Sequence, residues 1–358
     1  MPPLTCVDQF EHLARNDPAV TNAYLLVHSD QLGVHQTVAY GETEDSPAHI
    51  DQPVHLASVG KLVTATIIGI LHDQGRLALT DPISTILDRE LMHGLHVYHG
   101  REYSHDITIR HLLQQTSGLS DVFYPLLEQV ADDDTFRPTP RDAIIWGKTH
   151  RAPVATPGTR HVYTDTNYLL LGLIITAITR QPFHQVVHEL LFAPLGMDGA
   201  YVYGYSAPQH PSPYPLADLF LGGRNLKYLD GIPGIDYAGG SICAPLAEFL
   251  HFFQQLVAGK LVRPETLETM INDARPMGLS ALGFRYGYSI WSTMSIPLVL
   301  PKRYYCYGCV GVTGAVMFHH PATRSYIIGT FNHDSYKAAA LRFLLSRIIP
   351  ELVQRAKK

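Results

Sequence analysis

Residues 55–74 read HLASVGKLVTATIIGILHDQ, and this stretch decides how the rest of the chain is interpreted. From Ser58 onward, apolar residues recur on all sides of the helical wheel, which is typical of a buried helix. Gly75 is placed to end that helix. Ser58 and Lys61 stand in its first turn, where an i,i+3 spacing puts both side chains on one face within hydrogen-bonding reach. This arrangement predicts a serine nucleophile beside its activating amine.

The first turn of such a helix also suits acyl chemistry for electrostatic reasons. Its free backbone N–H groups and the positive end of the helix dipole stabilise a developing oxyanion. Apolar neighbours lower the pKa of the Lys61 amine, so that the amine can accept a proton. The same residues also fit an N-cap serine followed by a lysine that extends to solvent. The four-residue motif alone does not separate these two interpretations.

Composition excludes several classes of protein. With 358 residues, 46% of them hydrophobic and 16% charged, the chain is globular, with one large domain or two lobes. A net charge of -5 gives no cationic surface for nucleic acid. The first residues lack the segments of a signal peptide, and the longest apolar run, residues 168–178, is too short to span a bilayer. We therefore expect a cytoplasmic protein with no nucleic-acid or membrane partner.

The order of predicted elements indicates the fold class. A short helix at residues 8–14 precedes two strands, and more strands are predicted near the C-terminus before a final helix at residues 336–356. The predicted strands are residues 24–28, 36–40, 286–291, 303–307, 315–319 and 326–331. Helices fill most of the sequence between them. This order predicts an α+β fold with one antiparallel sheet built from both termini, flanked by helices, and an inserted, mostly helical lobe. The predicted boundaries are 1–75 with 236–358 for the sheet domain and 76–235 for the lobe, with the active site at the seam.

A second motif follows further along, where Tyr163-Thr164-Asp165 precedes the apolar residues 166–172. With it, the chain resembles the superfamily of serine β-lactamases and penicillin-binding proteins. It is similar in particular to the branch that holds class C β-lactamases, D,D-carboxypeptidases, D-aminopeptidases and family VIII carboxylesterases. The resemblance covers nearly the whole chain, with further ordered matches at residues 107–119 (ITIRHLLQQTSGL), 157–159 (PGT), 192–197 (FAPLGM) and 238–241 (AGGS). Such a series is far more specific than Ser-x-x-Lys alone.

The resemblance implies a β-lactamase/transpeptidase-like fold and a catalytic group of Ser58, Lys61 and Tyr163. Ser58 is acylated while Lys61 and Tyr163 move its proton onto the leaving group, and a water activated mainly by Tyr163 then hydrolyses the acyl-enzyme. The backbone N–H groups of Ser58 and Val312 form the expected oxyanion hole.

Asp165 departs from the pattern that the resemblance implies, because asparagine is usual at its position. An amide can donate a hydrogen bond to a substrate carbonyl, whereas a carboxylate cannot. A carboxylate near Lys61 also favours the charged amine. We therefore expect Asp165 to contact the substrate and to move the role of general base toward Tyr163.

The third motif of the superfamily, a Lys-Thr-Gly or His-x-Gly strand, aligns best with Cys309-Val310-Gly311. A shift to Val312-Thr313-Gly314 keeps the Thr-Gly letters but misaligns the neighbouring residues. Both registers lack the cation that usually binds a substrate carboxylate. We therefore expect Cys309, Val310 and Gly311 to form part of a substrate site that favours neutral esters or amides.

Neither a metal nor a cofactor is expected. His184 and His188 have the i,i+4 spacing of some zinc sites, but no third ligand is evident. The sequence thus predicts a serine hydrolase acting on a small-molecule ester, amide or short peptide, with an esterase favoured over a D,D-peptidase or β-lactamase. A catalytically weakened relative that binds a peptide or small ligand and an acyltransferase both stay open, because pocket shape decides between them.

Overall fold

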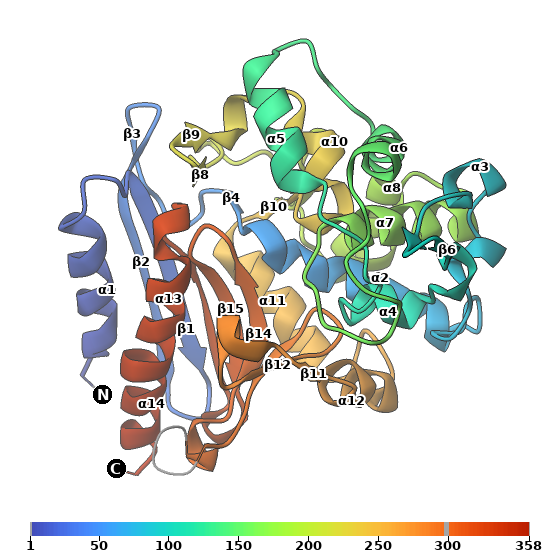
Figure 1. The fold of residues 1–358 in the computed structure, drawn as a ribbon. Helices are drawn as coiled ribbons and strands as arrows, with labels where there is room; N and C mark the ends of the chain where they lie inside the picture. The colour runs from blue at the N-terminus through green and yellow to red at the C-terminus, as the bar shows by residue number, and fades with distance from the viewer. Residues whose placement is uncertain (1, 297–300, 358) are drawn as a thin grey trace.

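A large antiparallel sheet forms the centre of the fold, and its strands come from both ends of the chain. The computed structural model describes residues 2–296 and 301–357. Within these residues the sheet has nine strands, in the order β11-β12-β13-β14-β15-β16-β1-β2-β3. Their bounds are β1 Asn22–Ser29, β2 Val34–Thr43, β3 Ser46–Pro47, β11 Arg275–Pro276, β12 Phe284–Tyr286, β13 Trp291–Thr293, β14 Tyr307–Gly311, β15 Ala315–His320 and β16 Ser325–Thr330. The N-terminal strand β1 pairs with the C-terminal strand β16, and the two ends of the chain lie near each other (Figure 1). The predicted α+β fold with a sheet from both termini is confirmed.

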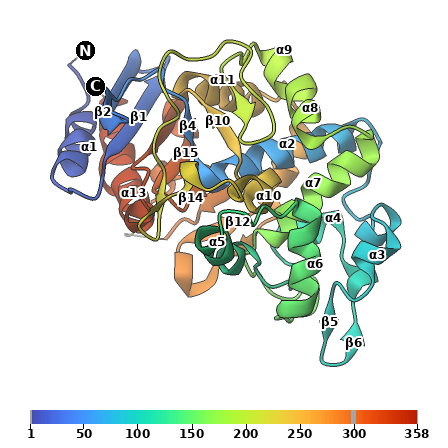
Figure 2. The same cartoon turned by 90° about the horizontal axis from the view of Figure 1, so that it is seen from above.

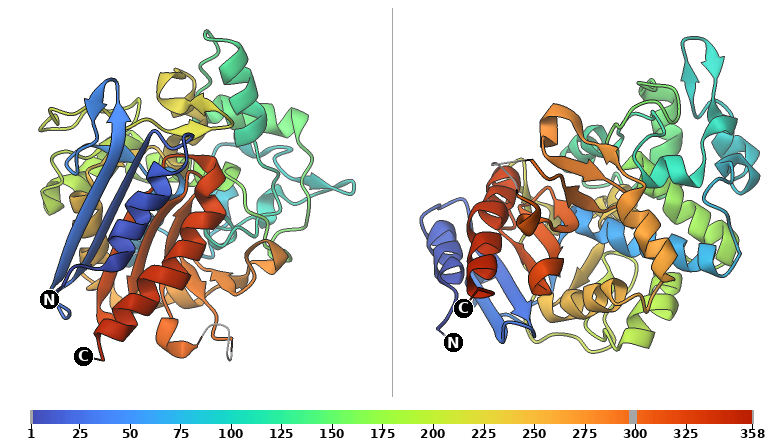
Figure 3. Two further views of the ribbon diagram at one scale, coloured as in Figure 1. Left: turned by 90° about the vertical axis from the view of Figure 1, so that its left-hand side faces the viewer. Right: turned by 90° about the horizontal axis from the view of Figure 1, so that it is seen from below.

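The alternation of side chains along β1 builds a core on each face of the sheet. Leu25 and Val27 belong to a core with α1 (Thr5–Arg15) and with the C-terminal segment that runs from α13 (Lys337–Phe343) to α14 (Ile349–Arg355). Tyr24 and Leu26 belong to the opposite core, with α2 (Lys61–Asp73) and α11 (Leu246–Val257). Figure 3 shows α1 and the C-terminal helical segment side by side on one face.

The other helices lie to one side of the sheet, as Figures 1 and 2 show. They are α3 Arg89–Met92, α4 Ile109–Leu113, α5 Phe123–Asp132, α6 Pro140–His150, α7 Thr166–Thr179, α8 Phe183–Val187, α9 Ala193–Leu195, α10 Ile232–Asp236 and α12 Pro264–Asn272. Short strands accompany them: β4 Val54–His55, β7 Tyr201–Val202 and β10 Ile242–Ala244 form one small sheet, with hairpins β5 Val97–Tyr98/β6 Arg101–Glu102 and β8 Phe220–Leu221/β9 Arg224–Asn225. The predicted domain boundaries stay predictions.

Two helices that are apolar on all sides occupy the middle of the molecule, α2 and α7. Their wheels have no polar face to turn to solvent, so both must be covered by other elements. Leu62, Ile67 and Ile68 of α2 are fully buried, as are Leu170 and Ile174 of α7. Because α2 is enclosed in this way, the residues at its N-terminal end are held in a fixed position.

Two of the predicted strands are wrong. Residues 286–291 span the end of β12, a turn, and the start of β13, and Ser289 in that turn has a φ of 61°. Residues 303–307 begin in a 3₁₀ turn, Lys302–Tyr304, and β14 starts only at Tyr307. In both cases aromatic residues with high β propensity extend into a turn, so composition alone placed the strand incorrectly.

Candidate active site

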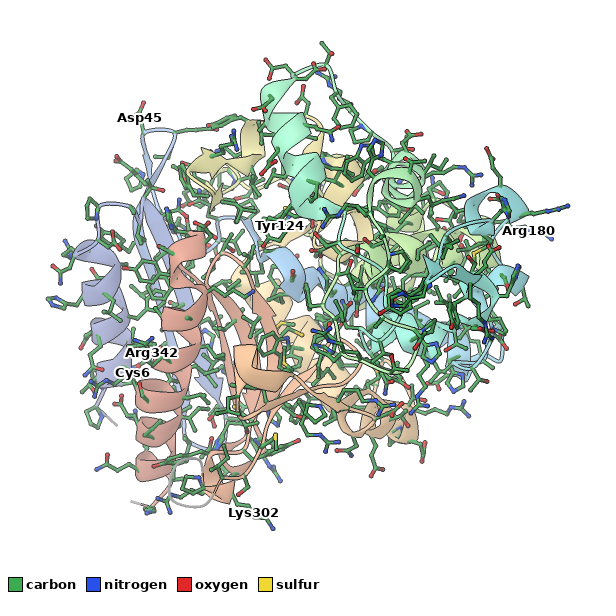
Figure 4. All side chains as sticks on the ribbon, in the orientation of Figure 1. Cys6, Asp45, Tyr124, Arg180, Lys302 and Arg342 are labelled. Carbon is green, nitrogen blue, oxygen red and sulfur yellow. The ribbon has the colours of Figure 1, made fainter. Side chains whose placement is uncertain are left out.

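A cavity of about 300 Å³ lies where residues of the sheet meet residues of the helices. Trp291 and Val310 come from the sheet, and Phe123 and Tyr124 come from α5. Tyr124 is labelled in Figure 4, at the lower end of α5. The full lining is His55, Ala57, Ser58, Phe123, Tyr124, His161, Tyr163, Asp165, Leu219, Leu221, Leu226, Ile232, Asp236, Met277, Ala281, Trp291, Val310, Val312, Thr313 and Lys337. Three residues predicted from the sequence as catalytic or oxyanion-binding, Ser58, Tyr163 and Val312, thus face one space.

Ser58 lines this cavity from a 3₁₀ turn, Ala57–Gly60, that leads directly into α2. The sequence predicted an α-helical first turn, and the tighter turn is a small correction. Lys61, the first residue of α2, is 2% exposed, and its Nζ atom donates to Ser58 Oγ at 3.0 Å. The i,i+3 spacing therefore places the two groups in hydrogen-bonding contact.

The Lys61 ammonium has two further acceptors. It donates to the Gly239 carbonyl at 2.6 Å and forms an ion pair with Asp165. Burial lowers the pKa of an amine, but the adjacent Asp165 carboxylate outweighs burial, and the pKa of Lys61 lies above its usual value. The expectation that apolar neighbours lower this pKa is therefore wrong, because the carboxylate is in direct contact with the amine.

Tyr163 reaches the same point from the loop before α7. Its ring centroid lies 5.4 Å from Lys61 Nζ, and its side chain is 36% exposed toward the cavity. Burial raises the pKa of the Tyr163 phenol, while the charge of Lys61 acts in the opposite direction. Ser58, Lys61 and Tyr163 thus converge as the sequence motifs predict.

The strand predicted to carry the third motif, β14, runs beside the Ser58 turn. A Cβ atom on Gly311 would lie 2.4 Å from the Leu56 carbonyl oxygen, so only glycine allows this close approach. Val310 lines the cavity, whereas Cys309 is buried behind it and its thiol donates to the Ser289 carbonyl at 2.9 Å. Burial raises the pKa of that thiol, which therefore stays neutral. Of the three residues predicted to bind substrate here, Val310 alone lines the cavity.

Comparison with known proteins agrees with this geometry. The family model described as Beta-lactamase matches residues 10–347. The chain belongs to the beta-lactamase family. A penicillin-binding protein of Bacillus subtilis (strain 168) is 26% identical over 271 residues, which is 71% of this chain and 56% of that protein. The chain spans about half the length of the curated relatives that it matches.

Solved structures of this beta-lactamase family fold superpose over almost the whole chain. A D-stereospecific amidohydrolase from Streptomyces sp. has a TM-score of 0.78 at 21% identity, covering 97% of this chain and 98% of that one. The D-amino acid amidase of Ochrobactrum anthropi SV3 has a TM-score of 0.73 at 20% identity, covering 99% and 98%. The fold is therefore that of the serine β-lactamase and penicillin-binding superfamily, and membership supports a hydrolase.

Sequence reasoning missed a histidine–aspartate pair close to Ser58. His55, at the end of β4, accepts the Ala57 N–H at its Nδ1 atom at 3.0 Å. Its Nε2 atom lies 3.0 Å from Asp236 Oδ2, and since Nδ1 is the acceptor, Nε2 carries the proton toward the carboxylate. Ala57 has a φ of 49°, which is costly for a residue with a side chain. The His55–Asp236 pair thus helps to hold the backbone just before Ser58.

A second carboxylate near the Lys61–Asp165 ion pair was also missed. Asp121 accepts the Asp165 N–H at 2.7 Å through its Oδ1 atom. Burial and the neighbouring charge of Asp165 raise the pKa of the Asp121 carboxyl to about 6. Its position depends on the fold of residues 119–122, and no periodic pattern in the sequence signals it.

Among the described residues, no group of three or more His, Cys, Asp or Glu side chains is arranged to hold a metal ion. None of the described helices is both long and apolar enough to cross a membrane.

Proposed function

We propose that the protein is a serine hydrolase that forms an acyl-enzyme on Ser58 and acts on a small ester or amide. The observation that carries this proposal is the Lys61 amine, hydrogen-bonded at once to Ser58 Oγ and to Asp165, with the Tyr163 ring beside it. A buried amine bound to the hydroxyl of a serine that lines a cavity is the arrangement that activates a nucleophile.

The acylation step follows from the protonation states. Asp165 keeps Lys61 in its ammonium form, so this amine cannot take the Ser58 proton without first returning one to Asp165. Tyr163 is the other acceptor. Burial keeps its phenol protonated, so it takes the Ser58 proton as it passes its own phenol proton to the leaving group. Ser58 Oγ then bonds to the substrate carbonyl carbon, and the proton passes through Tyr163 to the oxygen or nitrogen that leaves.

The charge that develops on the carbonyl oxygen needs donors near Ser58. The Ser58 amide lies in the first turn of a helix, where N–H groups have no partner within the helix, and Val312 follows β14 at the cavity wall. These two N–H groups bind the oxyanion in the proposed mechanism. A water molecule then attacks the acyl carbon, giving its proton through Tyr163 back to Ser58 Oγ as the ester bond breaks.

The walls of the cavity support an apolar acyl or leaving group. Phe123, Leu221 and Trp291 are among the large apolar side chains that line it. The amidohydrolase and amidase names of the two superposed proteins support an amide as well as an ester. The proposal therefore includes both esters and amides as substrates.

Covalent labelling tests this function. The protein is incubated with a fluorophosphonate and, separately, with a fluorescent penicillin, and the adduct is located by mass spectrometry. We expect an adduct on Ser58 that Ser58→Ala abolishes and that Ser346→Ala, which changes an exposed serine on the outer C-terminal helical segment, retains. Absence of labelling by both reagents, together with no turnover of p-nitrophenyl esters, would reject catalysis and favour a protein that only binds its ligand.

A further inference from the structure

A lysine that the catalytic proposal does not use lines the same cavity. Lys337 is the first residue of α13, and its side chain is exposed. Neither a hydrogen bond nor an ion pair joins its ammonium to another of the described residues. A cation at the first position of a helix is disfavoured by the helix dipole, so helix stability does not explain it. Lys337 lines the same cavity as Ser58, Tyr163 and Asp165. Partial burial of the amine lowers its pKa, the Asp165 charge opposes this effect and the Lys61 charge adds to it.

A second group without a partner lies beside it. Thr313 also lines the cavity, it is 0% exposed, and its Oγ1 atom has no hydrogen-bond partner among the described residues. Leaving a buried hydroxyl unpaired is destabilising. A Cβ atom on Gly314 would lie 2.8 Å from Tyr336 Cβ, so the Thr313–Gly314 turn packs directly against the residue before Lys337.

The acidic side chains that line the cavity already have donors of their own. Asp165 is paired with Lys61, and Asp236 accepts from His55 and from Ser241 Oγ at 3.2 Å. Lys337 is therefore the cavity cation whose charge no described carboxylate contacts. An anionic ligand group would provide both the missing counter-charge for Lys337 and the acceptor that Thr313 lacks.

We propose that Lys337 and Thr313 bind a carboxylate of the substrate. This inference rests on the proposed acyl-serine function and narrows its substrate class to esters or amides that carry a negative charge near an apolar group. The cation absent from Cys309 on β14 is thus supplied from α13, a helix more than twenty residues further along the chain. The proposal differs from the expectation of a neutral substrate, which rested on the third motif alone.

Matched pairs of esters test the proposal. One pair is p-nitrophenyl valerate and the p-nitrophenyl monoester of glutaric acid, with the charge on the acyl side. The other pair is phenyl phenylacetate and 3-carboxyphenyl phenylacetate, with the charge on the leaving group. We expect kcat/KM to favour the charged member of at least one pair by about tenfold or more, as for a charge-assisted hydrogen bond, and the preference to fall as salt is added.

Substitutions assign the preference to these residues. Lys337→Met should reduce the charged-to-neutral ratio of kcat/KM by about tenfold, mainly through KM, and Lys337→Glu should invert it. Thr313→Val, which keeps the side-chain shape, should reduce the ratio by a smaller factor. Lys260→Met removes the same charge from an exposed residue after α11 and should keep the wild-type ratio.

A measurement that needs no turnover tests the same proposal in variants that have lost activity. Phenylacetate should slow fluorophosphonate labelling of Ser58 more than phenylacetamide does, and Lys337→Met should remove that difference. Two results would overturn this inference alone, provided that the wild-type protein labels on Ser58. One is the absence of a preference for the charged ester in both pairs, and the other is a preference that Lys337→Met leaves unchanged. Failure of wild-type labelling overturns the proposed function instead.

Discussion

Asp165, which lines the cavity, forms an ion pair with the buried Lys61, so the amine beside Ser58 is held as an ammonium ion. The asparagine that is usual at this position would donate or accept one neutral hydrogen bond, whereas the carboxylate adds a full charge. Lys61 therefore acts as a fixed positive charge in the resting protein, and this is why the proposed mechanism moves protons through the phenol of Tyr163.

Replacing Asp165 with asparagine should move the pH–rate profile. Burial then acts on Lys61 without the opposing carboxylate, so the pKa of the amine falls and the neutral base forms at lower pH. We expect the acidic limb of kcat/KM against pH to shift to lower pH by about one unit or more. The measurement is the hydrolysis rate of one ester from pH 5 to 10. Asp198→Asn, at a carboxylate that pairs with His210 outside the cavity, is the control, and a profile unmoved by Asp165→Asn would contradict the assigned role.

Two substitutions of His55 separate its two hydrogen bonds. Asparagine places an acceptor near the position of Nδ1, so it can keep the hydrogen bond from the Ala57 N–H. Glutamine reaches the position of Nε2, so it can keep the hydrogen bond to Asp236. If the His55–Asp236 pair acts by holding the backbone before Ser58, His55→Asn should retain more activity than His55→Gln. We expect kcat to fall about 10–100-fold in His55→Gln with little change in KM, as for a hydrogen bond lost from a group that positions the nucleophile.

The same pair of variants has a second readout. The rate of fluorophosphonate labelling reports how well Ser58 is positioned to react, and it does not depend on which substrate the cavity prefers. Equal labelling rates in His55→Asn and His55→Gln, with equal loss of thermal stability, would show that the histidine only stabilises the fold.

Gly60 allows a close backbone contact that the Lys61 site needs. A Cβ atom there would lie 2.8 Å from the Gly240 carbonyl oxygen, next to the Gly239 carbonyl that Lys61 contacts. Gly60→Ala should push this segment away from the start of α2, costing about 1–3 kcal/mol of unfolding free energy by overpacking. Turnover should fall as well, because the acceptor of Lys61 moves. Denaturant unfolding and ester hydrolysis measure the two effects, and wild-type values for both would show that the contact relaxes freely.

The parts of this site that the sequence predicts are those carried by short motifs on buried helices. Ser58 and Lys61 share one helical turn, and Tyr163 precedes the apolar helix α7, so local spacing and ordered matches suffice to find them. His55 and Asp236 are 181 positions apart. Lys337 comes after the last strand of the sheet, far along the chain from Ser58 and Tyr163. No periodicity links such residues, because tertiary packing alone brings them to one cavity. The sheet was predicted best where a short run of apolar residues forms the strand, as at β1 and β16, and worst where tyrosines continue into turns.

The buried carboxyl of Asp121 should make the folded state less stable as pH rises. Its pKa is about 6 in the folded protein, against about 3.9 in an unfolded chain. Between these values the unfolded chain has released its proton while the folded protein still holds it, so the unfolding free energy decreases with rising pH and levels off above pH 6. The loss is about 2–3 kcal/mol, since each unit of pKa corresponds to about 1.4 kcal/mol.

Asp121→Asn removes this titration. Its amide oxygen can still accept the Asp165 N–H, so the local fold should persist. The difference in unfolding free energy between the variant and the wild type should therefore rise in favour of the variant by about 2–3 kcal/mol between pH 4 and pH 7. Urea unfolding of both proteins at several pH values gives this difference, in which the other titrating groups largely cancel. A difference that stays constant with pH would show that Asp121 is ionised throughout, and that a neighbouring cation compensates its charge.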